Sequence, residues 1–289
     1  MNLVVGATGF LGSDICRRFL QQNQSVRALV RSTSDPAKVA ALQSLGAEIV
    51  TGDLKDPASV AAACQGVRAV ISTASVTISR QAGDSIQAVD LEGQLNLLNA
   101  AKAAGVSHFV YVSYSGNIDI ACPLSTAKRT VEQRVQESGL TYTILRPTNF
   151  MEVWLSPVVG FDAANANVVV YGSGQNKVSW ISLGDVAQFA VESLTNPAAR
   201  NAVLELGGPE AISPLEVVKM LESATRRTFT VQHVPEEALQ AQLVAATDPI
   251  QQSFAALMLA TAQGDAIDMT ATLQTFPLRL TSVEDFVRR

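Results

Sequence analysis

Short apolar runs alternate with helix-length segments through the first two hundred residues of this 289-residue chain. The runs are rich in Val and Ile and nearly continuous in hydrophobicity, as expected of strands buried on both faces. Such alternation predicts right-handed crossovers and hence a parallel, doubly wound α/β sheet. The predicted strands are Asn2–Val5, Val26–Val30, Glu48–Thr51, Ala69–Thr73, His108–Ser113, Thr141–Leu145 and Val203–Leu206. The predicted helices among them are Gly12–Gln22, Pro36–Leu45, Pro57–Cys64, Ile86–Ala104, Ser125–Ser138 and Leu183–Ser193.

Glycines recur at a spacing of three directly after the first predicted strand, in the run Gly6-Ala7-Thr8-Gly9-Phe10-Leu11-Gly12. In such a strand-to-helix loop one glycine permits the turn, another lets the backbone approach a pyrophosphate, and the last allows close packing of helix on strand. Phosphate oxygens then accept from N–H groups at the positive end of the helix. The alternative is a glycine-rich turn without a ligand. In this context the loop predicts a dinucleotide-binding Rossmann fold, with Gly6, Thr8, Gly9, Phe10, Leu11 and Gly12 against the cofactor.

The second predicted strand ends in a cation. NAD-specific proteins carry an acidic residue about twenty residues beyond the glycine loop, where it binds the ribose 2′-hydroxyl. This chain has Val30-Arg31-Ser32 there, and Lys38 follows in the next predicted helix. A guanidinium group can pair with a 2′-phosphate. We therefore predict NADP(H) as the cofactor, bound by Arg31 and Lys38, with a solvated strand-end arginine as the alternative.

Two further segments follow predicted strands at the same edge of the sheet. In Gly52-Asp53-Leu54, Asp53 is suited to accept a hydrogen bond from the adenine amine or to cap the helix that begins near Pro57, and both interpretations stay open. Leu54 belongs to the same expected contact. The small residues of Thr73-Ala74-Ser75 can lie under the cofactor, or can allow tight packing of the sheet.

The regular alternation ends near residue 150. Residues 150–177 contain Pro157, several asparagines and a Gly-Ser-Gly turn, and we expect irregular structure there. Two helices, Ser213–Thr225 and Pro235–Ala246, and a strand at Thr228–His233 are predicted later, the first helix from its capping-box sequence. We expect an NADP-binding Rossmann domain over 1–150, completed by about 178–206. A smaller α+β substrate-side domain is expected over 151–177 and 207–289.

Composition excludes several classes of protein. The net charge of −5 argues against a nucleic-acid-binding face, which needs clustered Lys and Arg. Three scattered cysteines and two histidines match no metal-site spacing. His108, at the N-terminal edge of its strand, is expected to be structural, and His233 a surface or pocket residue. No apolar run approaches the roughly 20 residues that span a bilayer, and we expect no leader before the first strand. We expect a cytoplasmic protein without metal, membrane or nucleic-acid partners.

Several runs within residues 1–210 match a known family. They are Val5–Gly12, Val30-Arg31, Gly52-Asp53-Leu54, Phe109–Ser113, Ser125-Thr126-Ala127-Lys128 and Thr143–Glu152. Through them the chain resembles the atypical short-chain dehydrogenase/reductases, in particular the NmrA-like group that includes isoflavone-reductase-like proteins. The resemblance implies an NADP(H) site. It also implies that the segment Pro147-Thr148-Asn149-Phe150 lies near the nicotinamide.

The same resemblance identifies Lys128 as a candidate catalytic residue. Tyrosine-bearing members of the superfamily use a Ser, a Tyr and a Lys four residues after the Tyr, and the lysine lowers the tyrosine pKa and holds the nicotinamide ribose. Lys128 stands in the lysine's place, but Leu124 stands in the tyrosine's. Some isoflavone-reductase-like enzymes work with the lysine alone, whereas NmrA-like regulators bind the dinucleotide without catalysis. Ser113 and Tyr114 are weaker candidates for proton transfer, and Tyr114 is better suited to packing.

Three functions are consistent with these features. The first, which we favour, is an NADPH-dependent reductase of a small hydrophobic carbonyl, quinone or enone, assisted by Lys128. The second is a non-catalytic sensor of NADP(H) that binds a protein partner. The third is an assembly factor, because residues 54–98 and 144–150 also resemble photosystem-assembly members of the group.

Overall fold

The chain folds into two compact units. A computed structural model describes residues 1–78 and 80–288, so that Ser79 and Arg289 lie outside the described residues. The first unit comprises Met1–Ser113, Thr126–Leu145 and Val186–Leu204. The second comprises Tyr114–Ser125, Arg146–Asp185 and Glu205–Arg289.

A seven-stranded sheet in the order β3-β2-β1-β4-β5-β6-β9 confirms the doubly wound α/β fold. Its strands are β1 (Asn2–Val5), β2 (Val26–Val30), β3 (Glu48–Thr51), β4 (Ala69–Ser72), β5 (His108–Val112), β6 (Thr141–Pro147) and β9 (Ala202–Leu206). The pairings from β3 through β6 are all parallel. The strand order reverses between β1 and β4, which pair Val5 with Ser72. In open α/β sheets, ligands bind outside the carboxyl ends of the strands at such a switch point.

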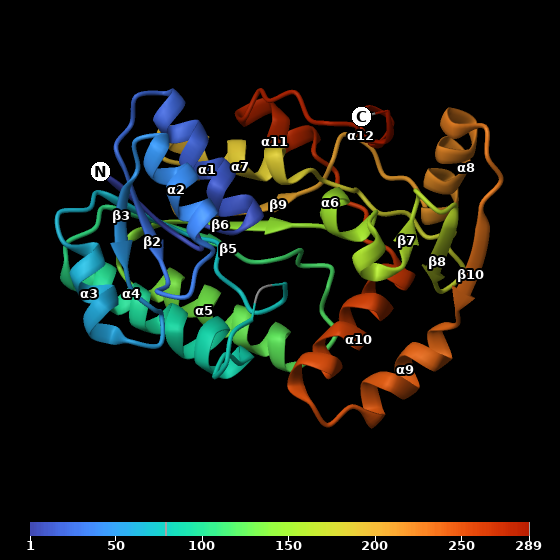
Figure 1. The fold of residues 1–289 in the computed structure, drawn as a ribbon, viewed down its shortest axis with the longest axis horizontal. Helices are drawn as coiled ribbons and strands as arrows, with labels where there is room; N and C mark the ends of the chain where they lie inside the picture. Colours follow the sequence, from blue (N-terminus) through green and yellow to red (C-terminus); the bar gives the residue numbers. More distant parts are fainter. Residues whose placement is uncertain (79, 289) are drawn as a thin grey trace. The chain divides into compact units, whose positions relative to one another are not determined.

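Helices cover both faces of this sheet. Figure 1 shows α1 (Phe10–Gln21) and α2 (Pro36–Ser44) above it, and α3 (Pro57–Cys64), α4 (Gln94–Ala103) and α5 (Pro123–Glu137) below. A further helix, α7 (Leu183–Glu192), precedes the 3-10 turn η3 (Pro197–Ala199) and β9. Every residue of β1 and β5 is buried, as the continuous apolar runs predicted. Burial of both faces explains why these strands lack an alternating pattern.

The predicted helix over 86–104 has two parts. Residues Ile86–Gly93 form a π-helix, η1, and α4 continues from Gln94. The Ser85 side chain caps η1 by accepting from the amide of Ala88 at 3.0 Å. At its C-terminal end a Cβ at Gly93 would lie 2.8 Å from Leu54 Cβ, so only glycine fits that approach. A π-helical turn changes the direction in which side chains leave the helix, and such turns are frequent at functional sites.

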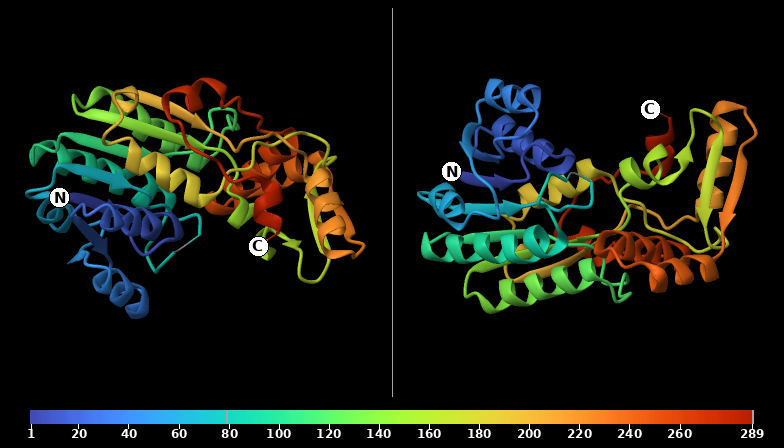
Figure 2. Two further views of the ribbon diagram at one scale, coloured as in Figure 1. Left: turned by 90° about the horizontal axis from the view of Figure 1, so that it is seen from above. Right: turned by 60° about the horizontal axis from the view of Figure 1, so that its bottom comes forward.

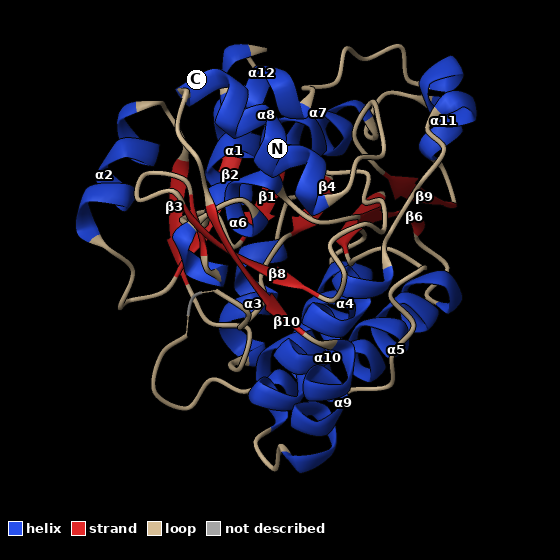
Figure 3. Ribbon diagram, turned by 90° about the vertical axis from the view of Figure 1, so that its right-hand side faces the viewer, coloured by secondary structure: helices blue, strands red, loops and turns tan. Residues whose placement is uncertain are grey.

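The second unit contains a three-stranded sheet in the order β10-β8-β7. β8 (Asn167–Tyr171) runs parallel to β10 (Thr230–Val234), as Figure 3 shows, and antiparallel to β7 (Phe161–Asp162). The expectation of irregular structure over 150–177 is therefore wrong for β7 and β8. The apolar run Val168–Tyr171 pairs on both sides despite the turn residues around it.

The described residues of the second unit also form several α-helices. The predicted helices are confirmed as α8 (Pro214–Thr225) and α9 (Glu236–Ala245), and the capping box of Ser213 and Glu216 at the start of α8 is complete. The others are α6 (Met151–Trp154), α10 (Pro249–Gln263), α11 (Thr270–Thr275) and α12 (Val283–Val287), with a 3-10 turn, η2 (Pro157–Val159), after α6. Helices α9 and α10 lie side by side in both views of Figure 2. No helix within 1–78 and 80–288 is both long and apolar enough to cross a membrane.

Candidate functional site

Two glycines of the segment between β1 and α1, Gly6 and Gly12, leave no room for a side chain. Gly6 has a φ of +82°, and a Cβ there would lie 2.6 Å from Thr73 Oγ1. A Cβ at Gly12 would lie 2.2 Å from the Gly6 carbonyl oxygen. The Gly9 amide closes the turn by donating to that same oxygen at 2.9 Å. The loop thus has the sharp turn and the close helix packing that its spacing predicted.

Helix α1 begins without a side-chain cap. Its N-cap is Gly9, and no acidic residue lies in its first turn. The first amides of a helix have no intrahelical acceptor, and the helix dipole favours an anion beside them. The loop and the helix start together fit the pyrophosphate of a dinucleotide. Thr8, in the loop, is partly exposed, whereas Leu11, in the first turn of α1, is buried.

Phe10 and Lys38 project from this edge. The Phe10 side chain is 64% exposed, which is unusual for a large apolar residue. The ammonium of Lys38 lies 5.7 Å from the centroid of its ring, a cation–π distance. Both residues were predicted to contact the cofactor, and this remains a proposal.

The end of β4 is tied to α4 by a buried glutamine that sequence reasoning missed. Gln94 accepts from Ser72 Oγ at 2.7 Å and donates to the carbonyl of Ala74 at 2.9 Å. Thr73 Oγ1 donates to the carbonyl of Val5 at 3.1 Å, which joins the ends of β4 and β1. Ser75 donates to Thr77 Oγ1 at 3.3 Å. The small residues Thr73-Ala74-Ser75 therefore lie next to the glycine loop at the switch point.

A carboxylate lies between two cations after β2 and β3. Arg31 Nη1 is 2.7 Å from Asp84 Oδ2, and Lys55 Nζ forms an ion pair with Asp84 Oδ1. The Asp84 side chain is 1% exposed. Burial by itself would raise the pKa of Asp84, but the hydrogen bond from Lys55, the Gln81 amide and the two positive charges together lower it. The hydrogen bond to Asp84 is also the main cause that raises the pKa of Lys55.

Asp53 does not cap the following helix. Asp56 is the N-cap of α3 and accepts from the amide of Ala58 at 3.0 Å. The capping interpretation of Asp53 is therefore wrong, because the N-cap position is taken by Asp56, three residues later. Asp53 instead accepts from the Lys55 amide at 2.9 Å and lies 3.6 Å from Lys55 Nζ. The adenine contact of Asp53 stays a prediction, while neighbouring Leu54 is buried and packs against Gly93.

Lys128 is a buried cation on α5. Its Nζ lies 3.8 Å from Asp90 Oδ1, 3.5 Å from the carbonyl oxygen of Val112 and 5.4 Å from the ring centroid of Tyr111. Burial lowers the pKa of Lys128, while the charges of Asp90 and Glu132 raise it and that of Arg129 lowers it. Asp90, on the π-helix η1, is completely buried and also accepts from the Val76 amide at 3.1 Å. Its role was not predicted, since no motif joins it to Lys128.

Ser113 follows β5 beside an arginine. Its Oγ accepts from Arg129 Nη1 at 3.5 Å, and the same nitrogen is 2.6 Å from Glu132 Oε1. Leu124 on α5 is 1% exposed, so an apolar side chain fills the position expected for a tyrosine. Tyr114 is buried at 9% exposure.

The segment that follows β6 has partners within the second unit. The Thr148 amide donates to Leu206 O at 2.9 Å, and Asn149 Nδ2 donates to Thr261 Oγ1 at 2.9 Å. Pro147 accepts from the Ser115 amide at 2.9 Å, and Phe150 is the N-cap of α6. Met151 and Trp180 belong to the buried core of this unit.

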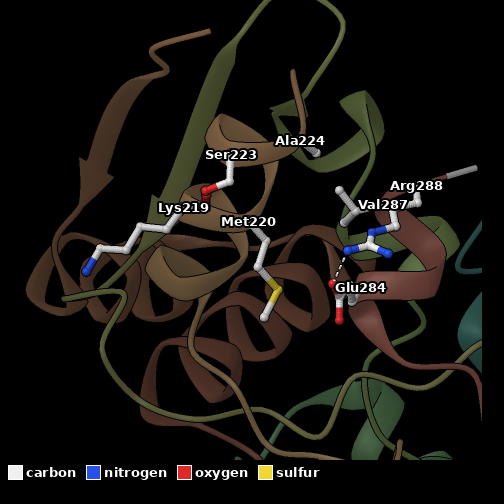
Figure 4. A pocket seen from close by; sticks show the side chains of 7 residues that line it. All are labelled: Lys219, Met220, Ser223, Ala224, Glu284, Val287 and Arg288. Atoms are coloured by element: carbon white, nitrogen blue, oxygen red, sulfur yellow. Dashed lines mark hydrogen bonds and ion pairs between the residues drawn. The ribbon is translucent and has the colours of Figure 1, made fainter. Parts of the chain in front are cut away.

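A separate pocket of about 340 Å³ lies between α8 and the chain's last residues (Figure 4). Glu284 and Arg288 in its lining form an ion pair with each other. Its lining consists of Lys219, Met220, Ser223, Ala224, Glu284, Val287 and Arg288. None of these residues was singled out by the sequence. Over the described parts of the chain, no group of three or more His, Cys, Asp or Glu side chains could hold a metal ion.

Comparison with known proteins identifies the family to which this chain belongs. The model of the NmrA-like family matches residues 2–287, and the chain belongs to this family, as the motifs predicted. An NAD(P)H azoreductase of Xenophilus azovorans is 34% identical over 228 residues, which cover 78% of this chain and 74% of that protein. Photosystem II assembly factor Ycf39 of Trieres chinensis is 32% identical over 240 residues, 81% of this chain and 72% of that protein.

A solved structure resembles the whole chain. An NADPH-dependent quinone oxidoreductase from Escherichia coli, complexed with NADPH, is 26% identical with a TM-score of 0.80, and the match covers 99% of this chain and 98% of that one. The predicted cofactor, NADP(H), agrees with this complex and with the azoreductase. The glycine cradle of this chain fits such a dinucleotide on its own geometry.

Proposed function

We propose that the chain is a cytoplasmic, NADPH-dependent reductase of a small hydrophobic carbonyl, quinone or enone. The observation that supports the proposal is the burial of Lys128 together with the partners that its ammonium group contacts. A buried ammonium group is stable only with good hydrogen-bond partners, and it has three N–H donors to satisfy. The two polar contacts of Lys128 Nζ, with Val112 O at 3.5 Å and Asp90 Oδ1 at 3.8 Å, are long. A hydroxyl or carbonyl oxygen of a bound ligand would be a suitable further hydrogen-bond acceptor for this group.

The proposed roles follow from the positions of the residues. Gly6, Gly9 and Gly12 bind the pyrophosphate through backbone amides. NADPH supplies a hydride to the substrate when it is bound. Lys128 holds a ribose hydroxyl and supplies a proton to the substrate oxygen, directly or through a water or a hydroxyl such as that of Ser113. The Asp90 carboxylate raises the pKa of Lys128 against the larger effect of burial, which lowers it.

A turnover assay with a matched lysine pair tests this proposal. NADPH consumption is followed with a panel of quinones, aldehydes and enones for the wild type, Lys128→Met and Lys102→Met. Lys102 is an exposed lysine in the last turn of α4, so its substitution removes the same charge elsewhere. Loss of a general acid lowers kcat by about 10²–10⁴-fold, which we expect for Lys128→Met only. Tight NADPH binding without turnover on the whole panel would reject the reductase.

An assembly or regulatory function is the second candidate. The similarity to photosystem II assembly factor Ycf39 favours it, as does Leu124 in place of a catalytic tyrosine. Under this alternative the chain binds NADP(H) and a protein partner. Equal NADPH binding by wild type and Lys128→Met, together with NADP(H)-dependent capture of one defined partner, would support it.

A further inference from the structure

Asp84 occupies the place that the sequence assigned to a phosphate. Arg31 follows β2 and Lys55 follows β3, so both cations lie at the carboxyl edge of the sheet, where ligands of this fold bind. Arg31 was predicted to pair with the 2′-phosphate of NADP(H). In the structure its guanidinium pairs with Asp84 at 2.7 Å, and Lys55 pairs with the other oxygen of the same carboxylate.

The Asp84 carboxylate is fully engaged by the protein itself. Oδ2 accepts from the Gln81 amide at 2.9 Å as well as from Arg31. The Gln81 side chain in turn accepts a hydrogen bond from Thr33 in the segment that follows Arg31. Asp84 is thus held against the β2–α2 segment by its own contact with Arg31 and by the neighbouring contact of Gln81 with Thr33. Its 1% exposure means that its negative charge is screened little by solvent.

The balance of charges around Arg31 and Lys55 determines whether this site can bind an added phosphate. Two cations, Arg31 and Lys55, are balanced by two carboxylates, Asp84 and the Asp53 that lies 3.6 Å from Lys55. A 2′-phosphate carries between one and two negative charges, and it gains from this site only if a cation is released to it. A ligand without the 2′-phosphate, such as NADH, can bind without the release of a cation from its carboxylate.

We propose that Asp84 is an internal competitor for the 2′-phosphate, and that it sets the preference of this chain between NADPH and NADH. When the phosphate binds, Arg31 exchanges its Asp84 partner for the phosphate oxygens, and Lys55 keeps the carboxylate. Asp84 therefore weakens the binding of NADPH and leaves that of NADH unchanged. The inference rests on the proposed function, because it assumes that the glycine loop binds NADP(H).

Binding affinities measured by calorimetry test the inference without any turnover. We expect Asp84→Asn to bind NADPH about tenfold more tightly than the wild type, equivalent to about 1.4 kcal/mol, with NADH unchanged. Asp84→Glu keeps the charge and is expected to stay near the wild type. Glu92→Gln removes one negative charge from the exposed side of η1, where Glu92 accepts from Gln87, and serves as the matched control. If Asp84→Asn does not fold, Asp84→Ser takes its place.

Four outcomes overturn the inference. Weaker NADPH binding by Asp84→Asn would show that Asp84 only orients Arg31 for the phosphate. An equal change for NADPH and NADH would show a general effect on the nucleotide site. Binding of neither nucleotide by any variant would reject the inference and the proposed function together. If the wild type binds NADPH and Asp84→Asn binds it no more tightly, the inference is rejected but the proposed function is not.

Discussion

Acidification is expected to destabilise the first unit through a single side chain, His108. Its Nε2 lies 2.8 Å from Thr143 Oγ1, and that hydroxyl donates to the carbonyl of Ala199 at 2.8 Å. Because the hydroxyl proton is already used, Thr143 accepts from His108, and Nε2 of the imidazole therefore carries a proton. Burial, with the charges of Arg200 and Arg68, lowers the pKa of His108 to about 4.

The size of the effect follows from the difference in pKa between the folded and unfolded states. The unfolded value is 6.5, so between about pH 6.5 and about pH 4 the unfolded chain binds the proton and the folded chain does not. The free energy of unfolding is therefore highest above pH 6.5 and falls as the pH drops through this window. At about 1.4 kcal/mol per unit of pKa, the full loss approaches about 3 kcal/mol. Roughly 2 kcal/mol of it falls between about pH 7 and about pH 5.

Urea unfolding followed by circular dichroism at several pH values measures this loss. His108→Gln keeps a side-chain N–H donor but does not titrate, so its stability is expected to fall less on acidification than that of the wild type. The chain has only two histidines, and His233→Gln is the natural control because His233 is exposed. Parallel pH profiles for the wild type and His108→Gln would refute the assignment of the acid sensitivity to His108.

The remaining predictions concern other parts of the molecule. Gly12→Ala places a Cβ 2.2 Å from the Gly6 carbonyl oxygen, so we expect about 1–3 kcal/mol of destabilisation and loss of NADPH binding by calorimetry; unchanged affinity would contradict the close approach. Asp90→Asn removes a carboxylate that raises the Lys128 pKa, so the pH dependence of NADPH affinity should move to lower pH; an unmoved profile would show that the two groups are not coupled. Burial raises the pKa of Cys16 to about 12 and of Cys64 to about 11, so mass spectrometry should find both thiols unlabelled by iodoacetamide until urea is added. Rapid labelling of the folded protein would contradict their burial. Ser213→Ala removes the cap of α8 and should cost about 1 kcal/mol in urea unfolding, whereas an unchanged midpoint would mean that the cap contributes nothing.

The central strands β1, β4 and β5 could be predicted because they are buried on both faces and appear in the sequence as continuous apolar runs. The strands β1, β2 and β3 have the predicted bounds, although β3 at the edge of the sheet is only partly buried. The glycine loop could be predicted because its glycines directly follow one predicted strand and open a predicted helix. In the second unit, β8 was missed because its short apolar run is flanked by asparagines and glycines. Helix α10 was missed although Asp248 and Pro249 mark its start.

The residues that complete the candidate site could not be found by spacing. Asp84 meets Arg31 across 53 positions of the chain, and Gln94 meets Ser72 across 22. Asp90 reaches Lys128 from a different helix, and it lies in a π-helical turn that hydrophobic periodicity does not distinguish from an α-helix. Contacts of this kind depend on how helices are placed over a sheet, and a single sequence contains no local signal for that placement.

The approach of Thr73 to Gly6 limits how the cofactor loop can be redesigned. A side chain at position 6 is excluded twice, by the positive φ and by the Thr73 hydroxyl 2.6 Å from the Cβ position. Position 73 is the freer of the two, but Thr73 also donates to Val5 at the end of β1. Serine keeps that hydrogen bond and valine loses it. A library that varies this loop should therefore hold glycine at position 6 and sample only small hydroxyl-bearing residues at position 73.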